Sequence, residues 1–308
     1  MVAVTSVAVC VATFRRPSGL ARLLASLFRQ AFVTGPAPEV KIVVVDNDAA
    51  GSAREVVERL RPESPWPIEY DIEPRRGISP ARNAAMRRAG PVDYFALIDD
   101  DEEACPGWVD ELLRAAREHQ ADLVAGPVPP KFVTPVAWWL RAGGFFGKVR
   151  SIPDGLHATF VPGTGNVLIR RAFLDPAVDR FSEEFGHSGG EDMLLFSALA
   201  RRGARIAWAG RARADETVAP SRANVAWLVS RAFRSGVIYT RIRLRLDRRR
   251  RLGSAMDCLL RGAAKAPFGL LLDPILALRA VQSIAVGLGM LVGGFDPVVP
   301  QYRRIHGS

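Results

Sequence analysis

The first hundred residues alternate between short apolar runs and longer segments with helical periodicity. The first two, residues 4–12 and 40–45, are rich in Val. Residues 68–72, which include Glu69 and Asp71, and the apolar residues 94–98 follow. The first two runs predict buried β-strands, residues 68–72 a short strand, and residues 94–98 a fourth strand. The segment between the first two runs places its apolar residues on one helical face, namely Leu20, Leu23, Leu24, Leu27 and Phe28.

Two further helices are expected between the later runs. One covers residues 53–60, and the other covers residues 79–89, with Ser79 as its N-cap and Pro80 at its first helical position. Strands that alternate with helices are typical of parallel βαβ units. We therefore expect an α/β fold that binds its ligands beyond the carboxyl ends of the strands.

The second half of the chain follows a different pattern. Residues 124–169 are rich in Pro, Gly and aromatic residues, which predicts loops with short strands. Helical periodicity returns over residues 181–202 and again over residues 223–239. We divide the chain into one large α/β domain, residues 1–240, and a basic and apolar helical tail, residues 241–308.

The tail contains an apolar, Gly-rich stretch, residues 255–295, that Asp273, Arg279 and Gln282 interrupt. Its last part, residues 280–295, is shorter than the ~20 apolar residues that a membrane-spanning helix needs. This pattern favours a segment that lies on a membrane over one that spans it.

Positive charge is concentrated beside this stretch. The net charge is +10, and residues 231–251 contain nine Arg and one acid. A local excess of this kind favours an anionic membrane surface. A nucleic-acid-binding protein is the alternative, but such proteins interleave aromatic and basic residues, and residues 241–251 contain no aromatic side chain. We expect no nucleic-acid partner. Three dispersed Cys and four scattered His indicate a reducing cytoplasm and give no pattern for zinc.

Two acidic clusters follow predicted strands. Asp46-Asn47-Asp48 follows the second strand, and Asp99-Asp100-Asp101-Glu102 follows the fourth. Crowded carboxylates repel one another, and a divalent cation such as Mg²⁺ or Mn²⁺ relieves this repulsion. The alternative is a solvated acidic turn.

A third acidic pair, Glu191-Asp192, follows Gly189-Gly190 and opens an apolar helix. It complements the helix dipole, and beside a metal and a diphosphate it becomes a candidate general base. The segment Gly163-Thr164-Gly165-Asn166 precedes a strand and has Leu168 where a dinucleotide fingerprint needs Gly, which excludes NAD binding.

The order of these motifs resembles that of family 2 glycosyltransferases, the inverting enzymes with a GT-A fold, and most of all the branch of succinoglycan-type exopolysaccharide glucosyltransferases. The resemblance covers roughly the first 240 residues. It rests on 13–17, 43–47, 77–83, 98–102, Trp108, 164–167, 190–192 and Arg231-Ala232-Phe233-Arg234-Ser235-Gly236.

The resemblance implies a role for each site residue. On the donor side, Thr13 and Arg15 line the nucleotide pocket, and Asp46 binds the base. Arg82 and Asn83 lie beneath the nucleotide. Asp99 and Asp101 are the two acids of the DxD motif: Asp101 ligates Mg²⁺ or Mn²⁺, and Asp99 contacts the ribose or the sugar and counts as a second candidate metal ligand.

On the acceptor side, the resemblance implies that Asp192 is the general base, with Glu191 as the alternative. One departure concerns the metal. Many relatives carry a His after the last core strand, whereas residues 214–218 contain none, so that Glu216 or water takes its place.

The expected activity is inverting transfer of a sugar from a UDP- or GDP-linked donor to a hydroxyl of a saccharide or lipid-linked acceptor. The expected location is the cytoplasmic face of the cell membrane. A nucleotidyltransferase of related fold is the alternative, but it requires a Gly-rich loop after the first strand, where this chain has Thr13-Phe14-Arg15-Arg16.

Overall fold

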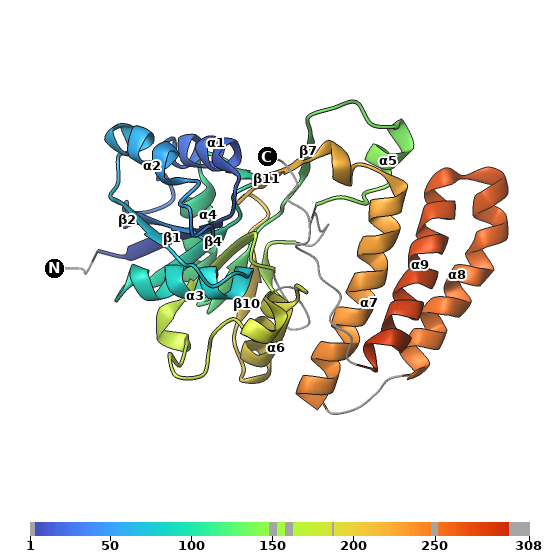
Figure 1. Cartoon of the computed structure of the whole chain (residues 1–308). Coiled ribbons are helices and arrows are strands. Elements are labelled where there is room, and N and C mark those ends of the chain that lie inside the picture. The colour runs from blue at the N-terminus through green and yellow to red at the C-terminus, as the bar shows by residue number, and fades with distance from the viewer. Residues whose placement is uncertain (1–3, 148–152, 158–162, 187, 248–251, 296–308) are drawn as a thin grey trace.

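A mixed eight-stranded sheet forms the centre of the computed structural model (Figure 1), which describes residues 4–147, 153–157, 163–186, 188–247 and 252–295. In spatial order the strands are β3 (Ile68–Ile72), β2 (Glu39–Asp46), β1 (Ser6–Thr13), β4 (Tyr94–Ile98), β9 (Asn166–Arg170), β6 (Leu123–Ala125), β10 (Ile206–Trp208) and β8 (Gly155–Leu156). A smaller sheet contains β5 (Glu102–Ala104), β11 (Ala214–Val218) and β7 (Pro130–Phe132).

The four N-terminal strands are parallel, which confirms the predicted α/β fold with its helix-flanked sheet. β9 then runs antiparallel between β4 and β6. The register places Thr13 opposite Asp46 at the carboxyl ends of β1 and β2. It also places Asn166 opposite Ile98, so that the start of β9 lies beside the acids that follow β4.

The side chains of β1 are apolar on both faces of the sheet, and helices therefore cover both faces. Val7, Val9 and Val11 pack with α1 (Pro17–Leu27), α2 (Arg54–Leu60) and α4 (Trp108–Glu118). Ala8 and Cys10 pack with α3 (Ile78–Ala89) and α6 (Glu191–Arg201).

Two helix starts differ from the prediction. α3 has Gly77 as its N-cap, at φ 133°, and Pro80 is its third residue. Ser79 is not the cap, because its hydroxyl donates to the carbonyl oxygen of Ser182 at 2.8 Å. α6 begins at Glu191 and not at residue 181: Glu183–Phe185 form a separate 3₁₀ turn, and Gly190, at φ 95°, is the N-cap of α6.

Three long helices lie side by side at the C-terminal end (Figure 1): α7 (Val225–Asp247), α8 (Leu252–Leu272) and α9 (Pro274–Gly293). α9 lies between the other two. Glycine permits the close approach, since a β-carbon on Gly289 would collide with the Phe233 carbonyl. α7 extends beyond residue 239 and crosses the boundary that we placed at residue 240. Residues 248–251 of the Arg-rich run lie outside the described residues. The short helix α5 (Trp138–Ala142) packs near α9.

α9 is longer than the sequence suggested. It starts at Pro274 because Asp273 caps it instead of interrupting it: the Asp273 carboxylate accepts a hydrogen bond from Ile275 N at 2.8 Å. Arg279 is accommodated by donating to the Gly143 carbonyl at 3.3 Å. Within the described part of the chain, α9 is the one helix whose length and composition would allow it to cross a membrane.

Candidate active site

The acids that follow β4 point in two directions. Asp100 is buried, and its carboxylate accepts hydrogen bonds from Thr13 Oγ1 and Arg16 Nη1, both at 2.8 Å. Burial raises the pKa of Asp100 to about 6, against the opposing effect of Arg16. Asp99 and Asp101 keep 33% and 18% of their side chains exposed. The two outer acids are therefore the ones that can meet a ligand.

Two arginines contact Asp101. Arg16 Nη1 lies 3.1 Å from Asp101 Oδ2, and Arg222 Nη1 lies 3.3 Å from the same oxygen. Arg222 Nη1 also lies 3.4 Å from Glu216 Oε1. The Asp101 and Glu216 carboxylates thus both contact the guanidinium of Arg222. We did not predict Arg16 or Arg222 as site residues. Arg222 is 121 positions from Asp101, and no local pattern marks it.

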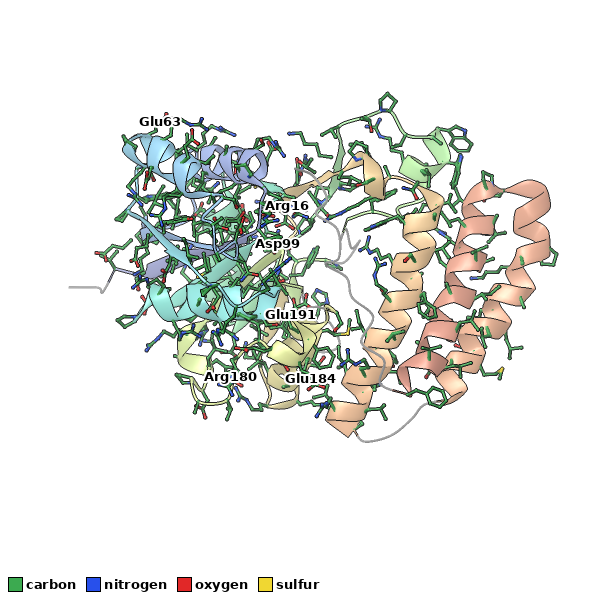
Figure 2. The ribbon with its side chains drawn as sticks, viewed as in Figure 1. Arg16, Glu63, Asp99, Arg180, Glu184 and Glu191 are labelled. Carbon is green, nitrogen blue, oxygen red and sulfur yellow. The ribbon has the colours of Figure 1, made fainter. Side chains whose placement is uncertain are left out.

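A buried arginine, Arg82, connects the two acidic halves of the site. Its Nη2 lies 2.7 Å from Asp99 Oδ1, and its Nη1 lies 2.5 Å from Glu191 Oε1. Figure 2 shows Arg16, Asp99 and Glu191 on the side of the sheet that faces α7. Asn83, the next residue on α3, holds the loop before α6 through both Phe181 backbone groups, each at 2.9 Å.

Glu191 and Asp192 have different surroundings. Glu191 is buried, and burial together with the Asp192 charge raises its pKa to about 7, despite the lowering effect of Arg82. Its Oε2 has no hydrogen-bond partner within the described residues. Asp192 is partly exposed, and its carboxylate accepts from Met193 N at 2.7 Å and Thr164 N at 3.4 Å. Asp192 is therefore the more accessible of the two carboxylates.

A tight turn, Thr164-Gly165, separates Asp192 from the β4 acids. A β-carbon on Gly165 would collide with Glu102 Oε1 and lie 3.3 Å from Asp99 Oδ2, so glycine is required for this approach. Asn166 anchors the turn by accepting from Trp108 Nε1 at 2.8 Å. The segment that resembled a dinucleotide motif is thus a wall of the acidic site.

On the β2 side, the Asp46 carboxylate accepts hydrogen bonds from backbone groups of the loop that follows β2. It is fully buried and accepts from Ala53 N at 2.7 Å and Tyr70 Oη at 3.0 Å. Asp48 instead pairs with Arg15, whose Nε lies 2.9 Å away and lowers the pKa of Asp48. Thr13 joins this side to Asp100, so the two acidic clusters meet at one sheet edge, as predicted.

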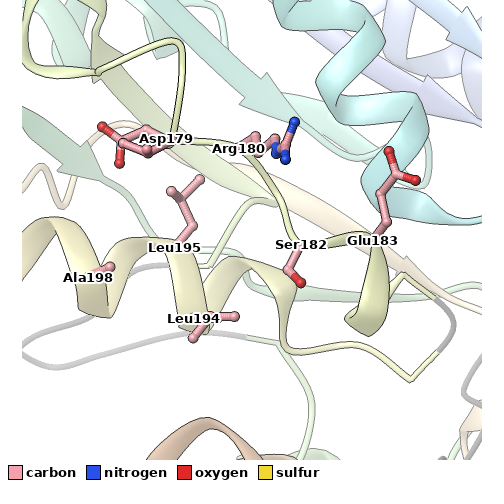
Figure 3. A pocket seen from close by; sticks show the side chains of 8 residues that line it. Asp179, Arg180, Ser182, Glu183, Leu194, Leu195 and Ala198 are labelled. Atoms are coloured by element: carbon pink, nitrogen blue, oxygen red, sulfur yellow. The ribbon is translucent and has the colours of Figure 1, made fainter. Parts of the chain in front are cut away.

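A separate cavity of about 600 Å³ lies beside α6 (Figure 3). Its walls come from the preceding loop and from one face of the helix: Val178, Asp179, Arg180, Ser182, Glu183, Leu194, Leu195 and Ala198. None of the acids described above lines it.

The chain belongs to glycosyl transferase family 2, since residues 8–175 match that family. A relative is the succinoglycan biosynthesis protein ExoM of Rhizobium meliloti (strain 1021), which is 38% identical over 232 residues, covering 75% of this chain and 73% of that protein. Family membership decides the choice between glycosyl and nucleotidyl transfer in favour of glycosyl transfer.

Solved structures confirm the expected GT-A-like fold. S. aureus TarS 1–349 in complex with UDP matches with a TM-score of 0.56 and 17% identity, covering 97% of this chain and 93% of that one. The mannosyltransferase PcManGT from Pyrobaculum calidifontis, in complex with GDP-Man and Mn²⁺, matches with a TM-score of 0.56 and 18% identity, covering 96% and 76%.

Proposed function

We propose that this glycosyltransferase moves a sugar, with inversion, from a UDP- or GDP-linked donor to a hydroxyl of a growing or lipid-linked saccharide in exopolysaccharide synthesis. The observation that carries the proposal is the Asp99–Arg82–Glu191 bridge, which holds the proposed donor-side acid next to the acid pair at the start of α6. Relatives with UDP and GDP-Man, and a relative in succinoglycan synthesis, support the donor class and the pathway class.

On the donor side, Asp99 and Asp101 are the acids that remain accessible. Thr13, Arg15 and Asp46 shape the neighbouring sheet edge, where the proposed nucleotide lies. Arg82 and Asn83 lie below this edge on α3. Asp46 acts by shaping its loop, because Ala53 N, Tyr70 Oη and Asp48 N already occupy its carboxylate.

A divalent cation, Mg²⁺ or Mn²⁺, fits the donor set. Asp101 and Glu216 face one cationic group, and carboxylate oxygens suit both ions. No group of three or more His, Cys, Asp or Glu within the described residues could hold a metal ion by itself. We therefore propose that Asp101, with Asp99 or Glu216, holds the ion together with phosphate oxygens of the donor. When bound, the ion neutralises charge on the departing diphosphate.

Asp192 is the proposed general base. It is the exposed member of the pair at the start of α6, and it lies across the Thr164-Gly165 turn from the β4 acids. In this position its carboxylate would take the proton of the acceptor hydroxyl as that oxygen bonds to the anomeric carbon, and the bond to the diphosphate breaks on the side of Asp99 and Asp101. Glu191 sets the position of this helix start through Arg82.

The proposed location is the inner face of the cell membrane, which the α8–α9 hairpin contacts. Exposed apolar side chains gather on the hairpin at Met256, Leu260, Val281, Leu288, Val292 and Phe295. On α9, residues 281, 288 and 292 recur with helical spacing and form one stripe. The Arg-rich end of α7 adjoins the hairpin and supplies charge for anionic lipid headgroups.

A donor screen tests the proposed activity. Purified full-length protein is incubated with UDP- and GDP-sugars, Mn²⁺ and a saccharide acceptor, and both the melting temperature and the release of nucleoside diphosphate on sugar transfer are measured. We expect one nucleotide class to raise the melting temperature and to support turnover. If no nucleotide sugar binds and none is turned over, the proposal is wrong.

A further inference from the structure

The motif Arg231–Gly236 has no role in the site described above, although it lies on the helix that faces it. Arg231, Arg234, Ile238 and Arg241 recur every three or four residues along α7 and therefore share one helical face. This face turns towards the start of α6, because Ile238 packs against Gly190 and Arg241 Nη1 donates to Ser188 Oγ at 3.1 Å.

Both ends of this face contact the proposed active site. At the upper end, Trp227 lies beneath the guanidinium of Arg222, 6.0 Å from Cζ to the ring centroid, and Arg222 contacts Asp101. At the lower end, Ile238 packs against Gly190, the residue before Glu191, so closely that a β-carbon on Gly190 would collide with it. Arg231 and Arg234 lie between these two contacts.

The charges of these two arginines are not neutralised. No carboxylate lies within 4 Å of either guanidinium in the described parts of the chain, whereas Arg222, Arg241, Arg243 and Arg245 are all paired. Arg231 Cζ lies 5.4 Å from the centroid of the Trp227 ring, which it shares with Arg222.

Burial makes the unneutralised charges of Arg231 and Arg234 more costly. It lowers the pKa of Arg231, where only Glu216 acts in the opposite direction, and it lowers the pKa of Arg234, where the charges of Arg231 and Arg222 add to the effect. Arg222 Nε is also buried without a hydrogen-bond partner in the described structure. Half-buried cations without a counter-charge are costly, and a bound anion removes that cost.

We propose that Arg231 and Arg234 form a diphosphate-binding site on α7, between the acids that follow β4 and the start of α6. Guanidinium groups bind phosphate oxygens through paired hydrogen bonds, and two guanidiniums one helical turn apart can meet two adjacent phosphates. The identity of the ligand rests on the proposed function. The diphosphate belongs either to the nucleotide donor or to the link between an acceptor saccharide and its lipid, and α7 leads directly to the apolar hairpin.

Inorganic pyrophosphate is the direct probe, because its binding requires no sugar transfer. Titration calorimetry in metal-free buffer compares the wild type with Arg231→Gln and Arg234→Gln. The control is Arg261→Gln on α8, an exposed arginine paired with Asp257. We expect each α7 variant to bind pyrophosphate at least ~10-fold more weakly, the effect of losing a charge-assisted hydrogen bond, and the control to be unchanged. Arg231→Lys, which keeps the charge, should recover part of the affinity.

Two further titrations distinguish the sources of the diphosphate. If the donor supplies it, both Gln variants also weaken UDP or GDP binding. If the lipid link supplies it, nucleotide binding stays at the wild-type level, and the variants lose binding to phosphatidylcholine vesicles that contain a prenyl diphosphate. Equal pyrophosphate affinity in the wild type and in both folded variants would overturn the site. If the variants lose pyrophosphate binding but the wild type turns over no nucleotide sugar, the phosphate site stands and only the proposed function is refuted.

Discussion

Arg82 Nη1 lies 2.5 Å from Glu191 Oε1, and the two residues are 109 positions apart in the sequence. The other terminal nitrogen of the same guanidinium lies 2.7 Å from Asp99 Oδ1. One buried cation therefore fixes the acid that follows β4 relative to the start of α6. The distance between the proposed donor-side and acceptor-side groups therefore depends on how α3 packs against the sheet.

The first prediction concerns the general base. Asp192→Asn should lower kcat by ~10²–10⁴-fold, the usual contribution of general-base catalysis. Donor affinity should change little, because the proposed donor position is on the other side of the Thr164-Gly165 turn. Glu191→Gln should be milder, since it keeps the shape of the side chain next to Arg82. Steady-state kinetics and donor titrations on both variants test this. An inactive Glu191→Gln enzyme beside an active Asp192→Asn enzyme would reverse the two roles.

The second prediction concerns the donor-side acids. Asp101→Asn should nearly abolish turnover and leave the melting temperature close to that of the wild type, because the partly exposed carboxylate is replaced by a group of the same size. Activity as a function of Mn²⁺ concentration is the measurement. Asp215→Asn on β11 is the matched control, since Asp215 pairs with Arg213 and not with the site. Full activity of Asp101→Asn, or full wild-type activity in excess EDTA, contradicts the assignment.

The third prediction concerns pH and stability. The folded-state pKa of Glu191 is raised to about 7 from a usual value of 4.5. The folded state therefore holds this proton more tightly than the unfolded state, and the resulting stabilisation is present below pH 4.5 and lost as the pH rises through about 7. Glu191→Gln has no such proton to lose.

Melting temperatures of both proteins between pH 4.5 and 8 test this prediction. The melting temperature of Glu191→Gln minus that of the wild type should become more positive as the pH rises. Burial also raises the pKa of Asp100, but this group is present in both proteins and cancels in the difference. A difference that does not change with pH would show that Glu191 titrates normally.

The fourth prediction concerns the membrane. The double variant Leu288→Gln and Val292→Gln should reduce cosedimentation with anionic vesicles at least ~10-fold, since fully burying one aliphatic side chain contributes about 1.5–3 kcal/mol and these two are 46% and 38% exposed. Val33→Gln is the control, because Val33 is 87% exposed but lies on the globular domain. A wild-type protein that stays in the supernatant at low salt, or a double variant that sediments like the wild type, would rule out this surface.

Local pattern was sufficient for the strands and for most of the acids. The strands predicted over residues 68–72 and 94–98 have the bounds of β3 and β4. The apolar run of β4 is buried inside the sheet, whereas β3 is a partly exposed edge strand that includes Glu69 and Asp71. Asp99, Asp101, Glu191 and Asp192 stood out because carboxylates next to apolar segments need a partner or solvent. The order of these motifs was also sufficient to identify the family.

The partners of those acids were decided by the tertiary structure. Arg16 and Arg222 reach Asp101 from positions 85 and 121 residues away, and no periodicity encodes a contact across that distance. Helix starts were also decided by the tertiary structure: Ser79 would cap a helix in isolation, but the Ser182 carbonyl takes its hydroxyl. The sequence determined which residues are apolar and which are charged. Packing of α3 and α6 against the sheet, and of α7 against α6, determined which charges meet, because burial makes an unpaired charge costly.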